Sequence, residues 1–521
     1  MTDAAAQTAP ADTGPVLAAD GRPLKASLNR ALRAQKTRAL MLIAPLLLFI
    51  LITFIFPIGD MLFRSVENQI VGDTLPRTVV ALRDWEDTSA PPSEDVYAAL
   101  YTDMLVAAEF RLNTRVGSRL NYEMTGISSL FRRSGRGVGR FDTDIYTDQF
   151  QALDGAWADP TTFAELLADP GIRANLPETA SAYDSWVDVI VELEEEDPAV
   201  EEPWDFVYTS LYRDLAAGGE TGGNALLAAA SAAVAGFETV SLRDQFADVS
   251  DDWLDPEVFE TIQLYSGNYT PGYFLTAVDL QLTNEGVQVQ DEDFRIYITL
   301  FKRTIFMSLV IMGSAVLLGY PVAFLLANLP MRTSNMLMIL VLLPFWTSLL
   351  VRTSAWKVLL QQQGVINDIL VWIGIVADDN RLALINNQTG TIIAMTHILL
   401  PFMILPLYSV MQTIPPTYVR AAKSLGATDW TAFWRVYFPQ SVPGIGAGCI
   451  LVFILSIGYY ITPELVGGRT GTFISNRIAY NISSSLNWGL AAALGSILLV
   501  LVLALYWAYD RIVGIDNVKL G

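Results

Sequence analysis

The sequence contains one cysteine and one histidine in 521 residues. Because Cys449 is the only cysteine, the chain can form neither an intrachain disulfide nor a cysteine-based metal cluster. The motif G-x-x-x-x-G-K-[ST] is also missing, so any ATP that this protein uses must be held by another chain. No metal site and no pairing of a nucleophile with a base stands out. We therefore expect no catalytic residue, no metal and no enzymatic activity in this chain.

Lysine is absent from one long stretch. Between residues 70 and 297 there are 42 acidic residues and 13 arginines, which gives a net charge of −29. The remainder has 12 acidic and 20 basic residues, a net of +8, and together they give the chain's −21. The sequence therefore joins two kinds of polypeptide, an acidic soluble part and a second part with basic flanks.

Long apolar runs are plentiful, and 52% of the residues are hydrophobic. A helix that crosses a bilayer needs about 20 such residues. We expect six spans: Ala39–Pro57, Ile305–Ala327, Met336–Trp356, Gly390–Met411, Gly446–Pro463 and Leu490–Tyr509. The first is too long for a signal peptide and lacks a cleavage site, so we interpret it as a retained helix.

Basic residues set the expected orientation, because they favour the cytoplasmic side. They crowd the start of the first span: Arg22, Lys25, Arg30, Arg33, Lys36 and Arg38. Counting spans from there predicts this order: a cytoplasmic tail (1–38, disordered over 1–20), a first transmembrane helix (39–58), an acidic periplasmic insertion (66–296), a five-helix core (301–511) with a cytoplasmic loop (412–445), and a cytoplasmic tail (512–521). Both termini would then be cytoplasmic.

Inside the insertion, SWVDVIVELEEE and GGNALLAAASAAVAGFE favour helices, the second too short to cross a membrane. TAVDLQLTNEGVQVQ alternates around Asn284-Glu285-Gly286, which predicts a hairpin. RRSGRGVGRF has spaced glycines without a strand–turn–helix context, so we expect a flexible loop there rather than a phosphate site. The insertion should be mainly helical with some β-structure.

The stretch VRAAKSLGATDWTAFWRVYFPQ, from Val419 to Gln440, lies between two spans. Pro415-Pro416 can begin a helix and Gly426 can end it. Thr428 or Asp429 can cap a second helix, Trp430 to Tyr437, which Pro439 would stop. Its small residues (Ala421, Ala422) and aromatics favour a protein interface over an amphipathic segment at the lipid surface.

This stretch resembles the EAA loop of the permease subunits of binding-protein-dependent ABC importers. The matching pattern is A-A-x-x-x-G, then nine residues, then Val436-x-Phe438-Pro439. In that family the loop forms a coupling helix that docks on the cytoplasmic ATPase. Its residues here are Arg420, Ala421, Ala422, Gly426, Asp429, Trp430, Val436, Phe438 and Pro439. Arg420 stands where the family usually has Glu, which reverses a charge.

Other segments are similar to the first permease subunit of spermidine/putrescine importers: LPFWTSLLVRTSAWKVLLQQQGVIND, ILLPFMILPLYS, GYPVAFLLA and YYITPELVGG. The similarity covers roughly Phe301 to Tyr509 and leaves the insertion unmatched. It implies an all-α membrane protein of the bacterial inner membrane that transports a small solute, for which the resemblance suggests a polyamine, and that has no cofactor of its own. ATP and Mg²⁺ would lie in two partner ATPase subunits. A second permease subunit in a heterodimer and a periplasmic binding protein complete the implied partners, with no role for nucleic acid.

Residues at the span ends allow two interpretations each. Arg352 can contact solute or partner, although snorkelling to the interface is commoner. Glu464 can attract a cation or be solvated. Trp346, Tyr459 and Tyr460 can line a translocation path for an amine, whereas aromatics at helix ends are more often interfacial anchors. His397 can relay protons, but a helix–helix hydrogen bond is the favoured interpretation.

Two other classes of protein also combine spans with an external domain. A sensor would continue into a long cytoplasmic helix or kinase, which this chain lacks. A secondary transporter should have internal repeats and discontinuous helices with ionisable residues at mid-membrane, and we find no convincing repeat. The acidic insertion itself admits three roles: steering a binding protein, attracting a cationic solute, or acting as a solubilising cover.

Overall fold

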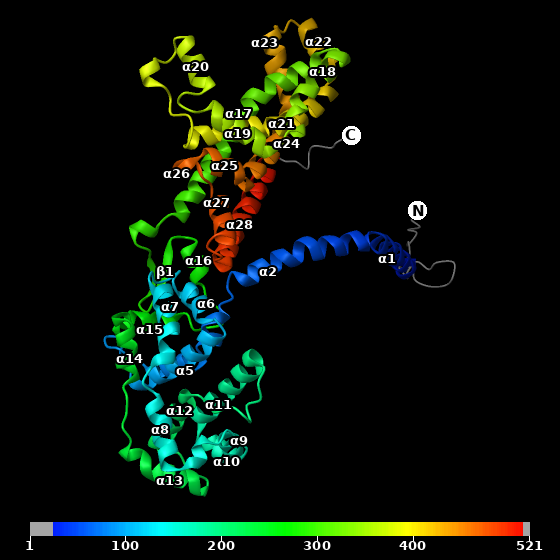
Figure 1. Ribbon diagram of the computed structural model, residues 1–521. Helices are drawn as coiled ribbons and strands as arrows, with labels where there is room; N and C mark the ends of the chain where they lie inside the picture. Colours follow the sequence, from blue (N-terminus) through cyan, green and yellow to red (C-terminus); the bar gives the residue numbers. More distant parts are fainter. Residues whose placement is uncertain (1–23, 514–521) are drawn as a thin grey trace, which may run out of the picture. The chain divides into compact units, whose positions relative to one another are not determined.

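The computed structural model describes residues 24–513 (Figure 1). It divides into two compact units, Met1–Phe63 and Arg64–Gly521. The expected disordered stretch 1–20 and most of the C-terminal tail lie outside the described residues.

The first unit is a helix of mostly apolar residues. It runs through α1 (Leu24–Ile50), a π-helical turn (Leu51–Ile55) and α2 (Phe56–Arg64). The 30 residues Gln35–Arg64 have a mean hydropathy of 2.9 and none of the most apolar window is buried. This helix covers the expected first span, and its length and apolar side chains suit a helix that crosses the bilayer.

The inserted region (residues 66–296) is a bundle of short helices. Its α-helices are α3 (Gln69–Thr74), α4 (Pro76–Ala81), α5 (Glu94–Glu109), α6 (Asn113–Leu120), α7 (Ile127–Gly137), α8 (Asp144–Leu153), α9 (Thr161–Leu167), α10 (Pro170–Asn175), α11 (Pro177–Val189), α12 (Asp205–Ala216), α13 (Ala225–Ala233), α14 (Leu242–Val249), α15 (Pro256–Leu264) and α16 (Gly272–Thr276). Short 3₁₀ turns and one π-helical turn, η5 (Ile190–Glu194), link or extend them. The predicted helices over 185–196 and 222–238 are confirmed.

The predicted hairpin is also confirmed. Strands β1 (Leu280–Thr283) and β2 (Gly286–Val289) pair antiparallel, with Thr283 opposite Gly286. This is the one sheet in the part of the chain that the structure describes. The inserted region is therefore mainly helical with a little β-structure, as the sequence indicates.

The prediction of a loop at RRSGRGVGRF is wrong, because these residues continue α7 and the 3₁₀ turn Val138–Arg140. Ile127, Leu130 and Phe131 bury one face of α7. Gly135 allows close approach on that side, since a Cβ there would lie 1.9 Å from Asn113 Nδ2 of α6. Gly135 and Gly137, where a Cβ would lie 2.8 Å from Val249, therefore serve helix packing rather than flexibility.

A continuous aromatic core holds the inserted region together. Trp253 is fully buried, and its ring centroid lies 5.3 Å from that of Phe246 and 5.5 Å from that of Phe131. Its Nε1 donates a 2.7 Å hydrogen bond to Ser134 Oγ, so the polar edge of the indole is satisfied. A core of this kind is expected of a domain that folds in water.

The membrane core (residues 301–511) contains the remaining helices: α17 (Tyr297–Asn328), α18 (Met331–Leu342), α19 (Leu349–Leu359), α20 (Val365–Trp372), α21 (Gln388–Thr413), α22 (Pro416–Ser424), α23 (Asp429–Ala432), α24 (Phe438–Gly458), α25 (Ile461–Val466), α26 (Gly468–Gly471), α27 (Ile474–Ser483) and α28 (Trp488–Val513). Helices α17, α21 and α24 share one buried cluster. At Gly448 of α24 a Cβ would lie 2.5 Å from Met403 Sδ of α21, so a small residue allows close packing here, as it does between membrane helices generally.

The third expected span is not one continuous helix but a bent pair. Met331–Trp346 and Leu349–Leu359 are bent by 95° relative to each other. The break follows Pro344, which lacks an N–H, and both Thr347 and Ser348 have extended backbone (ψ 144° and 140°). Among the described residues, five helices are long and apolar enough to cross a membrane, or six if the bent pair forms one span.

Asp279 links the inserted region to the membrane core. Its carboxylate accepts hydrogen bonds of 3.1, 2.8 and 2.9 Å from the backbone N–H groups of Ile296, Tyr297 and Ile298. These are N-terminal groups of α17, which have no partner inside the helix. The buried carboxylate therefore fixes the start of α17 to the segment that follows α16.

Candidate functional site

The aromatic loop (residues 412–445) begins with the turn that the sequence predicts. Helix α22 starts at Pro416, and Gly426 has φ +91°, the left-handed conformation expected of it. Its N–H donates to the carbonyl of Lys423 at 3.0 Å. Thr428, rather than Asp429, caps α23, because its Oγ1 accepts from the N–H of Thr431 at 3.3 Å. Asp429 instead forms an ion pair with Lys423 across the turn.

The prediction that Pro439 stops the second helix is wrong. Helix α23 continues through the π-helical turn η11 (Phe433–Tyr437) directly into α24. A proline inside an α-helix clashes with the carbonyl four residues earlier and cannot donate to it. The π-helical turn changes the hydrogen-bond spacing just before Pro439, so the helix passes through that position.

The aromatic side chains of this loop divide into two groups. Tyr437 packs inward, with its ring centroid 5.1 Å from that of Phe324, and Phe438 lies 5.8 Å from Tyr320, both in α17. Other large apolar side chains point outward: Leu425 is 89% exposed and Trp430 72%. The inward group fixes the loop on the helices, and the outward group leaves an apolar surface that the described residues do not cover.

A cavity of about 790 Å³ lies beside this surface. Its walls come from the ends of α17 and α21 and from α22, and Arg420, Lys423 and Asp429 contribute its charged groups. Lys423 and Asp429 pair with each other, whereas Arg420 is exposed and has no ion pair in the described part of the chain. Ala421 is exposed; Ala422 and Val436 are half-buried.

Two of the candidate path residues, Tyr460 and Glu464, share a partner, because Asn476 Nδ2 donates to the carbonyl of Tyr460 at 2.9 Å as well as to Glu464. Trp346, 77% exposed, ends the first half of the broken helix pair, and Tyr460 is 47% exposed at the end of α24. Glu464 is not simply solvated, because its Oε2 accepts from Asn476 Nδ2 at 2.6 Å. The carbonyl of Tyr459 accepts from Ser475 Oγ at 2.7 Å. These bonds tie the end of α24 and helix α25 to α27.

A smaller group does meet at the second half of the broken pair. His397 of α21 accepts a 3.1 Å hydrogen bond at Nδ1 from Trp356 Nε1 of α19, which confirms the expected helix–helix contact. Arg352, one turn earlier, lies close enough to His397 and Tyr459 to act on both electrostatically. The sequence did not predict this group, because the 95° bend that creates it was not foreseen.

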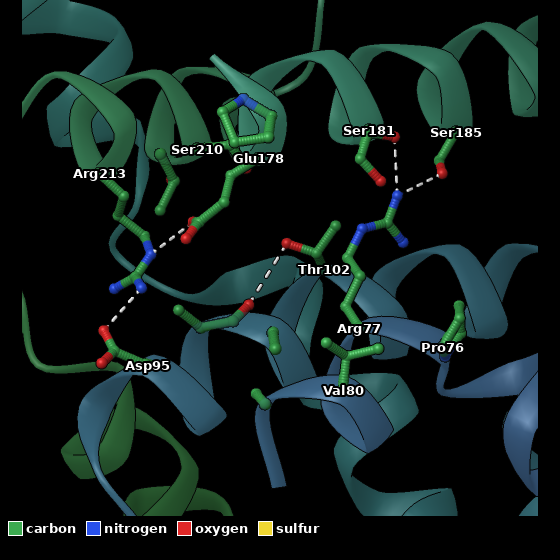
Figure 2. A pocket seen from close by; sticks show the side chains of 15 residues that line it. Pro76, Arg77, Val80, Asp95, Thr102, Glu178, Ser181, Ser185, Ser210 and Arg213 are labelled. Atoms are coloured by element: carbon green, nitrogen blue, oxygen red, sulfur yellow. Dashed lines mark hydrogen bonds and ion pairs between the residues drawn. The ribbon is translucent and has the colours of Figure 1, made fainter. Parts of the chain in front are cut away.

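The inserted region has a cavity of about 590 Å³ between α4, α5, α11 and α12 (Figure 2). Arg213 bridges Glu178 and Asp95, at 2.8 Å each. Arg77 donates to the carbonyl of Ser181 (2.7 Å) and to Ser185 Oγ (2.6 Å). Since both guanidinium groups are already bound to facing helices, they act as clamps across the cavity.

Arg77 also reaches a carboxylate below the cavity wall. Its Nη1 lies 3.0 Å from Oδ1 of Asp103, a fully buried side chain whose Oδ2 accepts from the N–H and Oγ1 of Thr78. Burial raises the pKa of Asp103 to about 6, while the Arg77 charge and the Thr78 hydrogen bonds act in the opposite direction. The carboxyl therefore changes its protonation state at mildly acidic pH.

Spanning helices, a glycine-packed core and an exposed aromatic loop define a membrane transport subunit. Comparison with known families agrees. The model of the binding-protein-dependent transport system inner membrane component matches residues 315–513. The chain is 33% identical over 220 residues to the spermidine/putrescine transport system permease protein PotB of Salmonella typhimurium, covering 42% of this chain and 76% of that protein. The chain therefore belongs to this family of ABC importer permeases and is a multi-pass protein of the inner membrane.

Other relatives differ in the solute that their names give. The inner membrane ABC transporter permease protein YdcU of Escherichia coli is 30% identical over 263 residues, covering 48% of this chain and 82% of that protein. The molybdenum transport system permease protein ModB of Mycobacterium bovis is 30% identical over 191 residues, 36% of this chain and 69% of that protein. Among solved structures, a bacterial ABC transporter that imports alginate matches with a TM-score of 0.36 at 20% identity, over 53% of this chain and all of that one.

Family membership decides against the two alternative classes of protein. A discontinuous helix was expected of a secondary transporter, yet Met331–Trp346 and Leu349–Leu359 form one in this permease. A broken helix therefore does not separate the two kinds of transporter. The inserted region lies before the matched residues 315–513, so it is an addition to the family domain.

Proposed function

We propose that this chain forms half of the translocation path of an ATP-driven importer for polyamines. A periplasmic binding protein delivers the solute, a second permease subunit completes the path in a heterodimer, and two cytoplasmic ATPase subunits bind ATP and Mg²⁺. The ATPases bias the permease between outward-open and inward-open states. The relatives named for spermidine and putrescine support the choice of solute, and the missing nucleotide motif supports a separate ATPase.

The aromatic loop is the surface on which we place the ATPase. The observation that carries this assignment is the outward pair Leu425 and Trp430, which the residues that the structure describes leave exposed. Large aromatic and aliphatic side chains of this kind are enriched at the centres of protein interfaces. Because Arg420 is unpaired and replaces an acidic residue of the family pattern, the ATPase groove should offer it a carboxylate.

The solute is tested by reconstituting the complete importer in proteoliposomes and measuring ATP-dependent uptake of labelled spermidine. Molybdate provides the contrasting solute, because it is an anion and is named for another relative. Uptake of spermidine that competes with putrescine and ignores molybdate supports the proposal. Uptake of molybdate alone would contradict it.

The orientation rests on the basic residues before the first span and requires an external inserted region. Protease added to spheroplasts should cut between residues 70 and 297 and leave 419–440 intact. The same protease should reach the aromatic loop only after the membrane is opened. Cleavage of the loop in intact spheroplasts would reverse the orientation.

A further inference from the structure

A second cavity lies where the inserted region meets the membrane core. Its volume is about 600 Å³, within the size range of small-molecule sites. One wall comes from the inserted region, at the end of α6, in α16 and beside the hairpin. The other comes from the start of α17, the end of α27 and the start of α28. We call it the junction cavity.

Aromatic rings line much of this cavity. They belong to Tyr122, Tyr273, Phe294, Tyr297 and Tyr480. The hydroxyl of Tyr122 donates to the carbonyl of Ser485 at 2.9 Å, which ties one wall to the other. Two of these rings already face a guanidinium: Arg119 lies 4.5 Å from the centroid of Tyr273 and Arg477 5.4 Å from that of Tyr480, so the rings open to a ligand are those of Tyr122, Phe294 and Tyr297. The faces of such rings carry negative partial charge and attract cations.

The charged groups of the cavity are mostly acidic. Glu123 pairs with the buried Arg119 at 2.7 Å and is neutralised. Glu257, Asp291 and Asp293 are exposed and form no ion pair among the described residues. The lining has one guanidinium, that of Arg477; a second, Arg295, bonds the carbonyl of Gln290 nearby.

Two amide side chains in the lining have unused polar atoms. Asn481 is 5% exposed, and its buried Nδ2 has no hydrogen bond of normal geometry, although the Tyr297 hydroxyl is nearby. Gln290 Oε1 is also buried without a partner. Since the Ser485 hydroxyl bonds Asn481 Oδ1 at 2.9 Å and can donate or accept, the amide of Asn481 can turn either end to the cavity. Buried amide atoms of this kind normally have partners.

We propose that the junction cavity binds an organic cation with two or more ammonium groups. An inner ammonium donates to Gln290 Oε1 and lies against the tyrosine rings, while an outer one meets Glu257, Asp291 and Asp293. The cavity of Figure 2 differs, because the Arg213 guanidinium already occupies its two carboxylates, those of Asp95 and Glu178. The choice of cation rests on the proposed polyamine function, and the site would hold the solute where the inserted region joins the spans.

Equilibrium dialysis of labelled spermidine against the purified full-length chain in nanodiscs tests this site without the binding protein or the ATPase. The test variant combines Glu257→Gln, Asp291→Asn and Asp293→Asn. The control combines Glu192→Gln, Glu194→Gln and Glu195→Gln, which removes the same charge from exposed positions around η5. We expect about one spermidine per chain, with Kd raised about tenfold in the test variant and less than about twofold in the control.

A second variant addresses the inner group. Gln290→Leu removes the unused acceptor with little change of volume and should weaken binding by roughly three- to tenfold. If the test and control triple variants weaken spermidine binding equally, the acidic surface as a whole attracts spermidine and the site is overturned. The site is also overturned if the wild type does not bind spermidine. Spermidine binding without spermidine transport would leave the site standing and reject the proposed solute. Spermidine transport without spermidine binding to this chain would support the proposed solute and reject the junction cavity as its site.

Discussion

Tryptophan is used in opposite ways by the inserted region and the membrane core. Trp157, Trp186 and Trp253 of the inserted region are completely buried. In the membrane core, Trp346 is 77% exposed and Trp372 87%. The first pattern follows from the free energy of hiding large apolar rings from water. Trp346 belongs to the broken helix pair, where surrounding lipid would remove that driving force, and Trp372 ends the short helix α20 outside the candidate spans.

Trp430 departs from both patterns. It is 72% exposed in the loop between α22 and α24, where neither a core nor an apolar run explains it. An exposed ring at such a place is accounted for by a protein that covers it. The comparison therefore separates buried tryptophans that build a core from exposed ones, and among the exposed ones we assign Trp430 to the proposed ATPase interface.

Replacing a buried and an exposed tryptophan should give the largest difference between the two regions. Trp253→Ala empties the space between Phe131, Phe246 and Phe259 and should lower the free energy of unfolding of the inserted region by about 3–5 kcal/mol. Trp372→Ala is the matched control and should change it by less than about 0.5 kcal/mol. Urea unfolding of the full-length chain in detergent, followed by fluorescence, measures both. Equal losses of unfolding free energy in the two variants would contradict the contrast between buried and exposed tryptophans.

The next largest effect is a pH dependence of the free energy of unfolding of the inserted region. The pKa of Asp103 is about 6 in the folded chain and 3.8 as its ordinary value. The folded state therefore holds this proton more tightly, and unfolding releases it between about pH 4 and pH 6. Asp103 therefore raises the free energy of unfolding as the pH falls through that window, by roughly 2–3 kcal/mol in total. Above the window it contributes nothing of this kind.

Asp103→Asn removes the titrating group and should flatten that part of the pH profile. The measurement is the slope of unfolding free energy against pH between 4 and 6 for the variant and the wild type. Asp252→Asn, on an exposed carboxylate paired with Arg133, is the control and should leave the slope nearly unchanged. Identical slopes in all three proteins would show that Asp103 does not titrate in this window.

The third and smaller effect is on ATPase binding and coupled uptake, and it compares the aromatic loop with the rest of the membrane core. Gly426→Val forces a β-branched residue into φ +91°, at a cost of about 1–3 kcal/mol, and should impair ATPase binding and coupled uptake. Gly374→Val imposes the same demand at φ +82° in the segment after α20, where nothing lies within 4 Å. It should retain ATPase binding. Purification with the ATPase and an uptake assay compare the two, and normal uptake by Gly426→Val would reject the docking surface.

Local patterns in the sequence predicted much of this architecture. The apolar runs located the membrane helices, the alternation around Asn284-Glu285-Gly286 located the hairpin, and Gly426 marked a left-handed turn. These features depend on residues close together in the chain. The assignment of the loop as an ATPase site came from family resemblance, and no contact in this structure tests it.

Features that depend on tertiary contacts were missed. The glycines near Gly135 indicated a loop until the approach of Asn113 explained them. The π-helical turn before Pro439 and the bend after Pro344 change how a proline acts, and single-residue rules do not foresee either. The junction cavity joins Tyr122 to Ser485, 363 positions apart, so no local pattern could indicate it.

The smallest expected effect concerns the surface charge that distinguishes the inserted region. Its net charge of −29 over residues 70–297 suits the steering of a basic face of the binding protein, which is the role we propose for it. Screening limits the reach of such a field to about 8–10 Å at physiological salt. Association of the binding protein with the full importer should therefore slow by roughly tenfold or more between low and high ionic strength, with a smaller change in dissociation.

Stopped-flow mixing at several salt concentrations measures that dependence. The control uses the importer with Glu192→Gln, Glu194→Gln and Glu195→Gln, which lowers the charge of one exposed segment without touching the core. Steering by the summed field predicts a slightly shallower salt dependence for this variant and an unchanged rate at high salt, where screening removes the field. An association rate that ignores both salt and the substitutions would leave the acidic surface as a solubilising cover, because a field that acts on the partner must be weakened by ions.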